Sequence, residues 1–135
     1  MKKKVGVFAS AVLMNAVLLG VSFASNADVD RAISYCRSIT SGIESLMDKD
    51  PKGTCRGDLR ITEAYLVAAQ NQLSHNKIDK ALDSVKLAKK ELGEISSMRT
   101  HCTEVSQDAK LLLSEVILLE SELDILERMR MAFSG

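Results

Sequence analysis

Residues 103–131 read TEVSQDAKLLLSEVILLESELDILERMRM, and this stretch predicts one long amphipathic helix. Its apolar residues alternate between spacings of three and four, which is the heptad pattern of a helix that packs along a coiled-coil-like seam. Glu104 near the start and Arg130 near the end complement the helix dipole and favour a single continuous helix. The seam consists of Ala109, Leu112, Val116, Leu119, Leu123 and Leu126.

Three shorter amphipathic helices are expected before this one. Apolar residues at helical spacing cover 29–47, 58–74 and about 78–97. Pro51 closes the first of these segments, and Asp58 is a suitable N-cap for the second. With 46% hydrophobic residues, 4% aromatic residues and one proline, the chain of 135 residues predicts an all-α domain and excludes a sheet protein or a disordered chain. We expect a small four-helix bundle or a set of helical hairpins.

The helix lengths bear on how the helices fit together. At 1.5 Å per residue the first three are each about 25 to 30 Å long and the last is about 43 Å, so the last must overhang, bend or pair elsewhere. Its centre is apolar on more than one side, as in a helix contacted on two sides. One interpretation is burial within its own bundle. The other is a surface for a partner or for self-association, formed by Leu119, Leu123, Leu126, Met129 and Phe133.

The second and third helices carry large and small residues in a recognisable order. The pattern consists of Tyr65, then Ala68 and Ala69, a turn at Asn76, Lys77 and Ile78, and then Ala81, Val85 and Ala88. Over residues 61–95 it resembles a single tetratricopeptide-like helical hairpin, with departures from the family pattern at Gln72, Asn76 and Gly93. The resemblance implies a helical scaffold that binds segments of other proteins.

Residues 1–27 have the layout of a secretory signal peptide, with three lysines, an apolar run and then small residues, and we expect a signal peptide helix here, before the bundle. Small residues at positions −3 and −1 predict a cut after Ala27, with a cut after Ala24 as the alternative, and leave a helical domain over 28–135. A short lysine-led signal suits a bacterium, so we expect a periplasmic protein, with secretion as the alternative. A membrane anchor that is not cleaved is a further alternative, because residues 5–24 approach the length of about 20 residues that spans a bilayer.

Cleavage changes the charge balance of the protein. The full chain has 18 basic and 18 acidic residues, and removal of Lys2, Lys3 and Lys4 leaves a net charge of −3. A mildly acidic protein without a basic stripe excludes nucleic acid as a partner and, after cleavage, an anionic membrane surface.

Three cysteines in an exported chain predict one disulfide and one free thiol. In an antiparallel hairpin the start of the second helix lies beside the end of the third, which favours a bond between Cys55 and Cys102. Cys36 lies on the apolar stripe of the first helix, where we expect a buried small hydrophobe. Bonds of Cys36 to Cys55 or to Cys102, or between molecules, are the alternatives.

The sequence predicts no catalytic residue, no cofactor and no metal site. It lacks a G-x-S-x-G motif, a phosphate-binding glycine loop and a C-x-x-C pair. His101 and Cys102 are the only close pair of metal-ligand type, and adjacent side chains are expected to point apart. His75 is expected in the turn at the opposite end of the hairpin.

The leading hypothesis is therefore an exported, non-enzymatic interaction or adaptor protein. It would hold another protein, or a second copy of itself, through the last helix or the concave side of the hairpin. The first alternative is an envelope stress protein that binds a small ligand or a metal through Cys36, His101, Cys102 and the methionines. The second is a membrane-tethered form of the leading hypothesis.

Overall fold

The computed structural model describes residues 21–97 and 101–134, which form four α-helices and one short 3-10 helix. In chain order these are α2 (Val21–Lys49), α3 (Arg56–Ser74), α4 (Ile78–Ser96), η1 (Thr103–Val105) and α5 (Ser106–Ser134). No strand occurs within these residues, and the prediction of an all-α protein is confirmed. Most of the predicted signal peptide lies outside the described residues.

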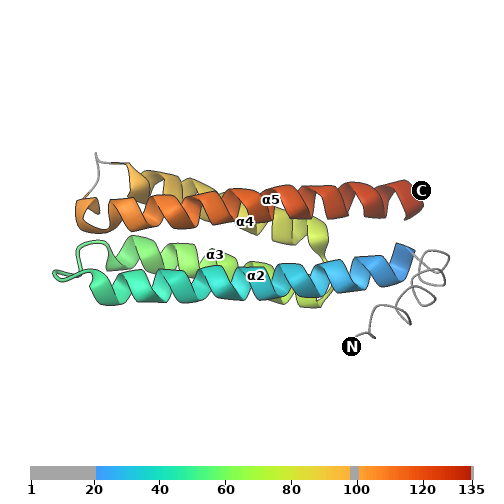
Figure 1. The fold of residues 1–135 in the computed structure, drawn as a ribbon, viewed down its shortest axis with the longest axis horizontal. Coiled ribbons are helices and arrows are strands. Elements are labelled where there is room, and N and C mark those ends of the chain that lie inside the picture. Colours follow the sequence, from blue (N-terminus) through green and yellow to red (C-terminus); the bar gives the residue numbers. More distant parts are fainter. Residues whose placement is uncertain (1–20, 98–100, 135) are drawn as a thin grey trace, which may run out of the picture.

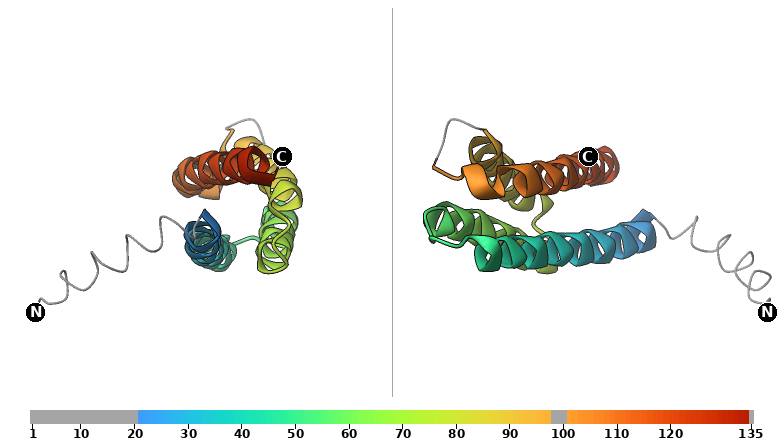
Figure 2. Two further views of the ribbon diagram at one scale, coloured as in Figure 1. Left: turned by 90° about the vertical axis from the view of Figure 1, so that its right-hand side faces the viewer. Right: turned by 60° about the vertical axis from the view of Figure 1, so that its left-hand side comes forward.

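The helices run up, down, up and down along one axis (Figure 1). Each helix packs against the next one in the chain, and α5 also packs against α2, so the four helices close a ring. Figure 2 shows this arrangement from near the end of the bundle, with α3 and α4 on one side and α2 and α5 on the other. Short connections between antiparallel neighbours produce this topology, and the predicted four-helix bundle is confirmed.

Helices α2 and α5 each have 29 residues, whereas α3 and α4 each have 19. The expectation of a short first helix over 29–47, and of excess length in the last helix alone, is therefore wrong. Residues 21–28 contain neither proline nor glycine, so nothing in them interrupts α2. The start of α2 and the end of α5 extend beyond the α3–α4 turn at the same end of the bundle (Figure 1). Helix α2 thus runs across the predicted boundary between residues 27 and 28.

The core is a single cluster to which all four helices contribute. Its largest buried side chains include Ile39 and Ile43 of α2 and Leu119 and Leu123 of α5. The side chain of Leu112 packs directly over Gly42, because a Cβ at this position would lie only 2.7 Å from Cδ2 of Leu112. The other members from α3, α4 and the turns are Cys55, Leu59, Leu66, Ala69, Leu73, Ile78, Ala81, Leu82, Val85, Ala88, Leu92, Ile95, Cys102 and Val105.

The turn between α2 and α3 is held by a buried carboxylate. Asp50 accepts a hydrogen bond of 2.8 Å from the backbone N–H of Cys55, which is the N-cap residue of α3. The predicted N-cap, Asp58, lies instead in the first turn of this helix. At the other end of α3, Asn76 adopts a left-handed φ of 60° and its N–H bonds to the carbonyl of Leu73. Asparagine tolerates this conformation, which allows the short connection to α4.

Candidate functional site

The surface predicted on the last helix lies mostly inside the protein. Leu119 and Leu123 have no exposed area and Leu126 is buried, because they form the side of α5 that completes the bundle core. Met129 is half-buried, and the side chain of Phe133 lies outside the described residues. The three leucines therefore stabilise the bundle itself, and their prediction as partner-binding residues is corrected.

A second apolar stripe lies on the outer side of α5. Leu111, Leu118 and Ile125 are 67%, 57% and 54% exposed and are spaced seven residues apart. This spacing keeps side chains on one helix face, with a drift of about 20° per seven residues. Ile117 and Met131 are also exposed, but they lie about 100° and 120° around the helix from this line of residues. We call Leu111, Leu118 and Ile125 the outer stripe of α5. The sequence indicates this stripe through the run from Leu111 to Leu119. In this run apolar residues occur at the positions that face the core and also at positions on the exposed side of the helix.

Acidic side chains flank the outer stripe. On the side next to α2, Glu115 and Glu122 lie near Tyr35. The pKa of the Tyr35 phenol is raised, mainly by burial and to a smaller extent by the negative charges of these two glutamates. Neither glutamate forms an ion pair with another described residue. Asp124, on the side next to α4, pairs with Arg128 at 3.0 Å. The edge next to α2 therefore carries two carboxylates that form no ion pair with a described residue, although Arg31, which pairs with Asp28, lines the same hollow as Glu122.

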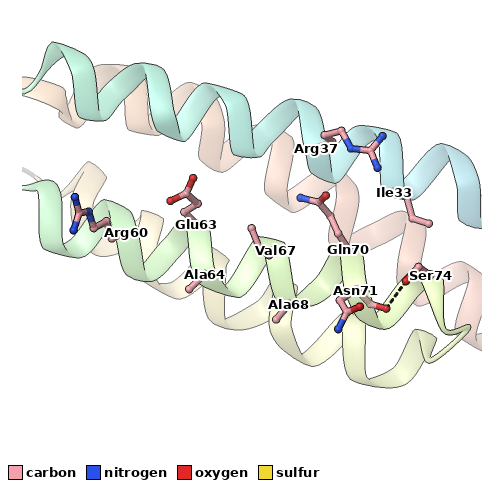
Figure 3. A pocket seen from close by; sticks show the side chains of 10 residues that line it. All are labelled: Ile33, Arg37, Arg60, Glu63, Ala64, Val67, Ala68, Gln70, Asn71 and Ser74. Carbon is pink, nitrogen blue, oxygen red and sulfur yellow. Dashed lines mark hydrogen bonds between the residues drawn. The ribbon is translucent and has the colours of Figure 1, made fainter.

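A shallow groove of 720 Å³ runs between α2 and α3. Figure 3 shows Ile33 of α2 and the small residues Ala64 and Ala68 of α3 among its lining side chains. At its rim a hydrogen bond with Glu44 raises the pKa of the Glu63 carboxyl, with smaller contributions from burial and the charge of Glu44. The remaining lining residues are Arg37, Arg60, Val67, Gln70, Asn71 and Ser74. The lining residues include no histidine or cysteine, and the hydroxyl of Ser74 donates to the carbonyl of Asn71 at 2.7 Å, with Nδ1 of His75 3.4 Å away.

The disulfide joins Cys55 to Cys102 with the two Cα atoms 5.0 Å apart, which is the pair predicted from the hairpin. Both residues lie outside the α-helices, at the end of the bundle where the α2–α3 turn and the α4–α5 connection meet (Figure 1). The Asp58 carboxylate lies between them and His101. Its Oδ2 atom is 2.8 Å from Nε2 of His101 and 3.6 Å from Sγ of Cys102. His101 and Cys102 therefore approach the same oxygen, and the expectation that their side chains point apart is wrong.

The remaining cysteine lies elsewhere. Cys36 is fully buried and free, and its thiol donates to the carbonyl of Leu66 at 3.5 Å. Burial raises the pKa of this thiol to about 12. His75, in the α3–α4 turn, bonds to the carbonyl of Asn71 at 2.8 Å. Of the groups considered for a metal, only His101 and Cys102 lie together, while Met98 is outside the described residues.

These features define an up-down-up-down four-helix bundle that is closed by one disulfide at one end. None of its helices within the described residues is long and apolar enough to cross a membrane. The chain matches no protein-family model, and neither a curated protein nor a solved structure is significantly similar to it. The resemblance of residues 61–95 to a tetratricopeptide-like hairpin therefore stays a prediction based on the residues alone.

Proposed function

We propose that this is an exported, non-enzymatic interaction protein that binds an amphipathic helix of another protein through the outer stripe of α5. The observation that carries the proposal is the seven-residue spacing of Leu111, Leu118 and Ile125 on an exposed face. Apolar side chains at this spacing fill one of the two core positions of each heptad, and the apolar face of a second helix would pack against them.

The charges beside the stripe favour a basic partner. Glu115 and Glu122 carry negative charge along the edge next to α2 and have no ion-pair partner among the described residues. A partner helix with lysine or arginine beside its apolar residues would complement this edge. In a two-fold antiparallel contact with a second copy, the same edge of each α5 would face the other. That arrangement places like charges together, so we infer another protein as the partner.

Export is the second part of the proposal, and it is based on the layout of residues 1–27. The Cys55–Cys102 disulfide is compatible with an oxidising compartment such as the periplasm. The intact mass of the protein from the cell envelope tests this part directly. A chain that begins at Asp28 and has one free thiol supports export and cleavage. A full-length chain with three free thiols contradicts both.

A pair of synthetic helical peptides tests the interface. Both repeat leucine every seven residues, and they differ only in carrying lysine or glutamate at the flanking positions. We expect the lysine peptide to bind more tightly, by fluorescence anisotropy, and its affinity to fall with salt. Leu118→Asp adds a negative charge that by itself would attract the lysine peptide. We still expect it to lower that affinity at least tenfold, because it removes an apolar contact from the stripe. Val67→Asp, at an exposed site of α3, is the matched control and should leave the affinity unchanged.

Reversal of the edge charge checks the preference for a basic partner. In the double variant Glu115→Lys and Glu122→Lys, binding should shift from the lysine peptide to the glutamate peptide. Equal binding of both peptides to the native protein would contradict the charge argument. If sedimentation shows a dimer that Leu118→Asp dissociates, the occupant of the stripe is a second copy, and the proposal of a basic partner is wrong.

A further inference from the structure

Four side chains of metal-ligand type gather where the α2–α3 turn meets the α4–α5 connection. They are Cys55, Asp58, His101 and Cys102, and we call them the cysteine corner. A ligand atom of Cys55, of Asp58 and of Cys102 all lie within 4.8 Å of one another. The fourth atom, Nε2 of His101, lies 2.8 Å from Oδ2 of Asp58. Two sulfurs, one imidazole nitrogen and one carboxylate oxygen are ligands that zinc takes in a tetrahedral site.

The disulfide prevents metal binding at this corner. In a tetrahedral zinc site with Zn–S bonds of about 2.3 Å, two sulfur ligands are about 3.8 Å apart. Sulfurs joined covalently are about 2.05 Å apart and are not thiolates. A metal ion can therefore bind to both sulfurs only after the bond between Cys55 and Cys102 is reduced.

We propose that the reduced protein binds one zinc-type divalent cation through Cys55, Asp58, His101 and Cys102. A dithiol reductant supplies two electrons and two protons, its own two thiols become a disulfide, and the Cys55–Cys102 bond is replaced by two thiols. When the cation binds, these thiols release their two protons to water and both sulfurs become thiolate ligands. The corner is thus a disulfide under oxidising conditions and a metal site under reducing ones. This inference does not depend on the outer stripe of α5.

The surroundings of the corner would hold such ligands in place. The backbone N–H of Cys55 is fixed by the buried carboxylate of Asp50, and the hydroxyl of Thr54 donates to the carbonyl of His101 at 3.2 Å. Cys55 and Cys102 are both buried, whereas the Asp58 and His101 side chains are 34% and 61% exposed. The sulfur ligands are therefore shielded from water, and an ion can enter from the side of the two exposed ligands.

Nearby carboxylates add negative charge to this end of the bundle. The pKa of the Glu91 carboxyl of α4 is raised, first by burial and then by the charges of Glu94 and Asp58. The charge of Asp58 therefore reaches Glu91, and Lys90 acts on Glu91 in the opposite direction.

Cobalt substitution tests this proposal. In a Cys36→Ala background, the purified protein is reduced with a phosphine, which does not compete as a thiol ligand, and titrated with Co²⁺. We expect the visible bands of tetrahedral Co²⁺ together with thiolate charge-transfer absorption, and displacement of both by Zn²⁺. Native mass spectrometry should show one zinc per chain and the loss of two protons. The oxidised protein should show none of these signals.

Two single variants assign the remaining ligands. Asp58→Asn and His101→Ala should each lower zinc affinity at least tenfold, measured by competition with a chelator. His75→Ala, at the opposite end of the bundle, is the matched control and should leave the affinity unchanged within twofold. If reduction unfolds the chain, zinc should restore its helical circular dichroism in the parent protein and less so in the two ligand variants.

Three results would overturn the proposal. The first is a reduced, folded protein that gives no tetrahedral cobalt spectrum. The second is a reduced, unfolded protein that zinc does not refold. The third is zinc affinity that is the same in Asp58→Asn, His101→Ala and the parent, which would reduce the site to an ordinary pair of thiols.

Discussion

Leu118 and Leu119 are neighbours in the chain, yet Leu118 is 57% exposed and Leu119 has no exposed area. A helix turns about 100° per residue, so these two side chains belong to two different faces of α5. Leu119 belongs to the seam that completes the bundle core, and Leu118 belongs to the outer stripe. The two apolar faces of this helix therefore have different consequences for stability and for association.

Alanine substitution of these two leucines should separate the roles. Leu119→Ala should lower the free energy of unfolding by about 2 to 5 kcal/mol, because it leaves a cavity in the core. Leu118→Ala should change it by less than about 0.5 kcal/mol, since the site is on the surface. Urea unfolding of both variants measures the difference. Equal losses of stability would show that Leu118 is also buried in solution.

Removal of the disulfide should destabilise the protein. Replacement of both Cys55 and Cys102 by alanine removes the cross-link between two residues that are 47 positions apart in the chain. The loop-entropy model gives a loss of about 4 kcal/mol for closure of a loop of this size. Thermal unfolding of this double variant measures the loss. The single variant Cys36→Ala keeps the disulfide and serves as the control, and an unchanged melting temperature in the double variant would contradict the expectation.

The buried thiol of Cys36 should make stability fall at high pH. Its pKa is raised from 9.0 to about 12 by burial, so the folded chain keeps the thiol proton that the unfolded chain loses. The contribution of the protonated Cys36 thiol to the free energy of unfolding is therefore present below pH 9. It is lost between about pH 9 and 12, at a rate of about 1.4 kcal/mol per pH unit.

The variant Cys36→Ala isolates this effect from the titration of lysines and tyrosines. We expect the difference in unfolding free energy between parent and variant to shift in favour of the variant as the pH rises. Alkylation offers an independent check, because Cys36 should react with iodoacetamide only in denaturant. Rapid labelling of Cys36 in the native protein would contradict its burial.

Glu63 and Glu44 should destabilise the native bundle at neutral pH. The raised pKa of Glu63 means that the folded chain holds its proton more tightly than the unfolded chain does. The stabilising effect of that proton is present at acidic pH and is lost as the pH rises through the raised pKa. Glu63→Gln should therefore raise stability near pH 7 by a few tenths of a kcal/mol, as for other like-charge pairs on helices.

The same substitution should have a smaller effect near pH 4, where the raised pKa of Glu63 keeps a proton on its carboxyl. Melting temperatures of the parent and of Glu63→Gln at both pH values measure the difference. Glu44→Gln is the matched variant, and the double variant should gain less than the sum of the two. If Glu63→Gln raises the melting temperature equally at both pH values, repulsion between the carboxylates of Glu63 and Glu44 is not the cause.

The helices and the disulfide could be predicted well from the sequence because each has a local signal. The spacing of apolar residues predicts α3 and α4 within two residues of their observed ends. Antiparallel topology brings Cys55 to Cys102 whatever the details of packing. The predicted start of the first helix at residue 29 is too late, because residues 21–28 contain no proline or glycine and α2 begins at Val21.

By itself the sequence determined the all-α class, the number and order of helices in the described chain and the heptad seam of α5. These follow from local periodicity, because one face of each helix must leave water. Only the tertiary structure decided which of the two apolar faces of α5 turns inward. It also decided that Asp58, His101 and the two cysteines meet at one corner. Both outcomes depend on how residues distant in the chain pack together, and no local pattern of residues contains that information.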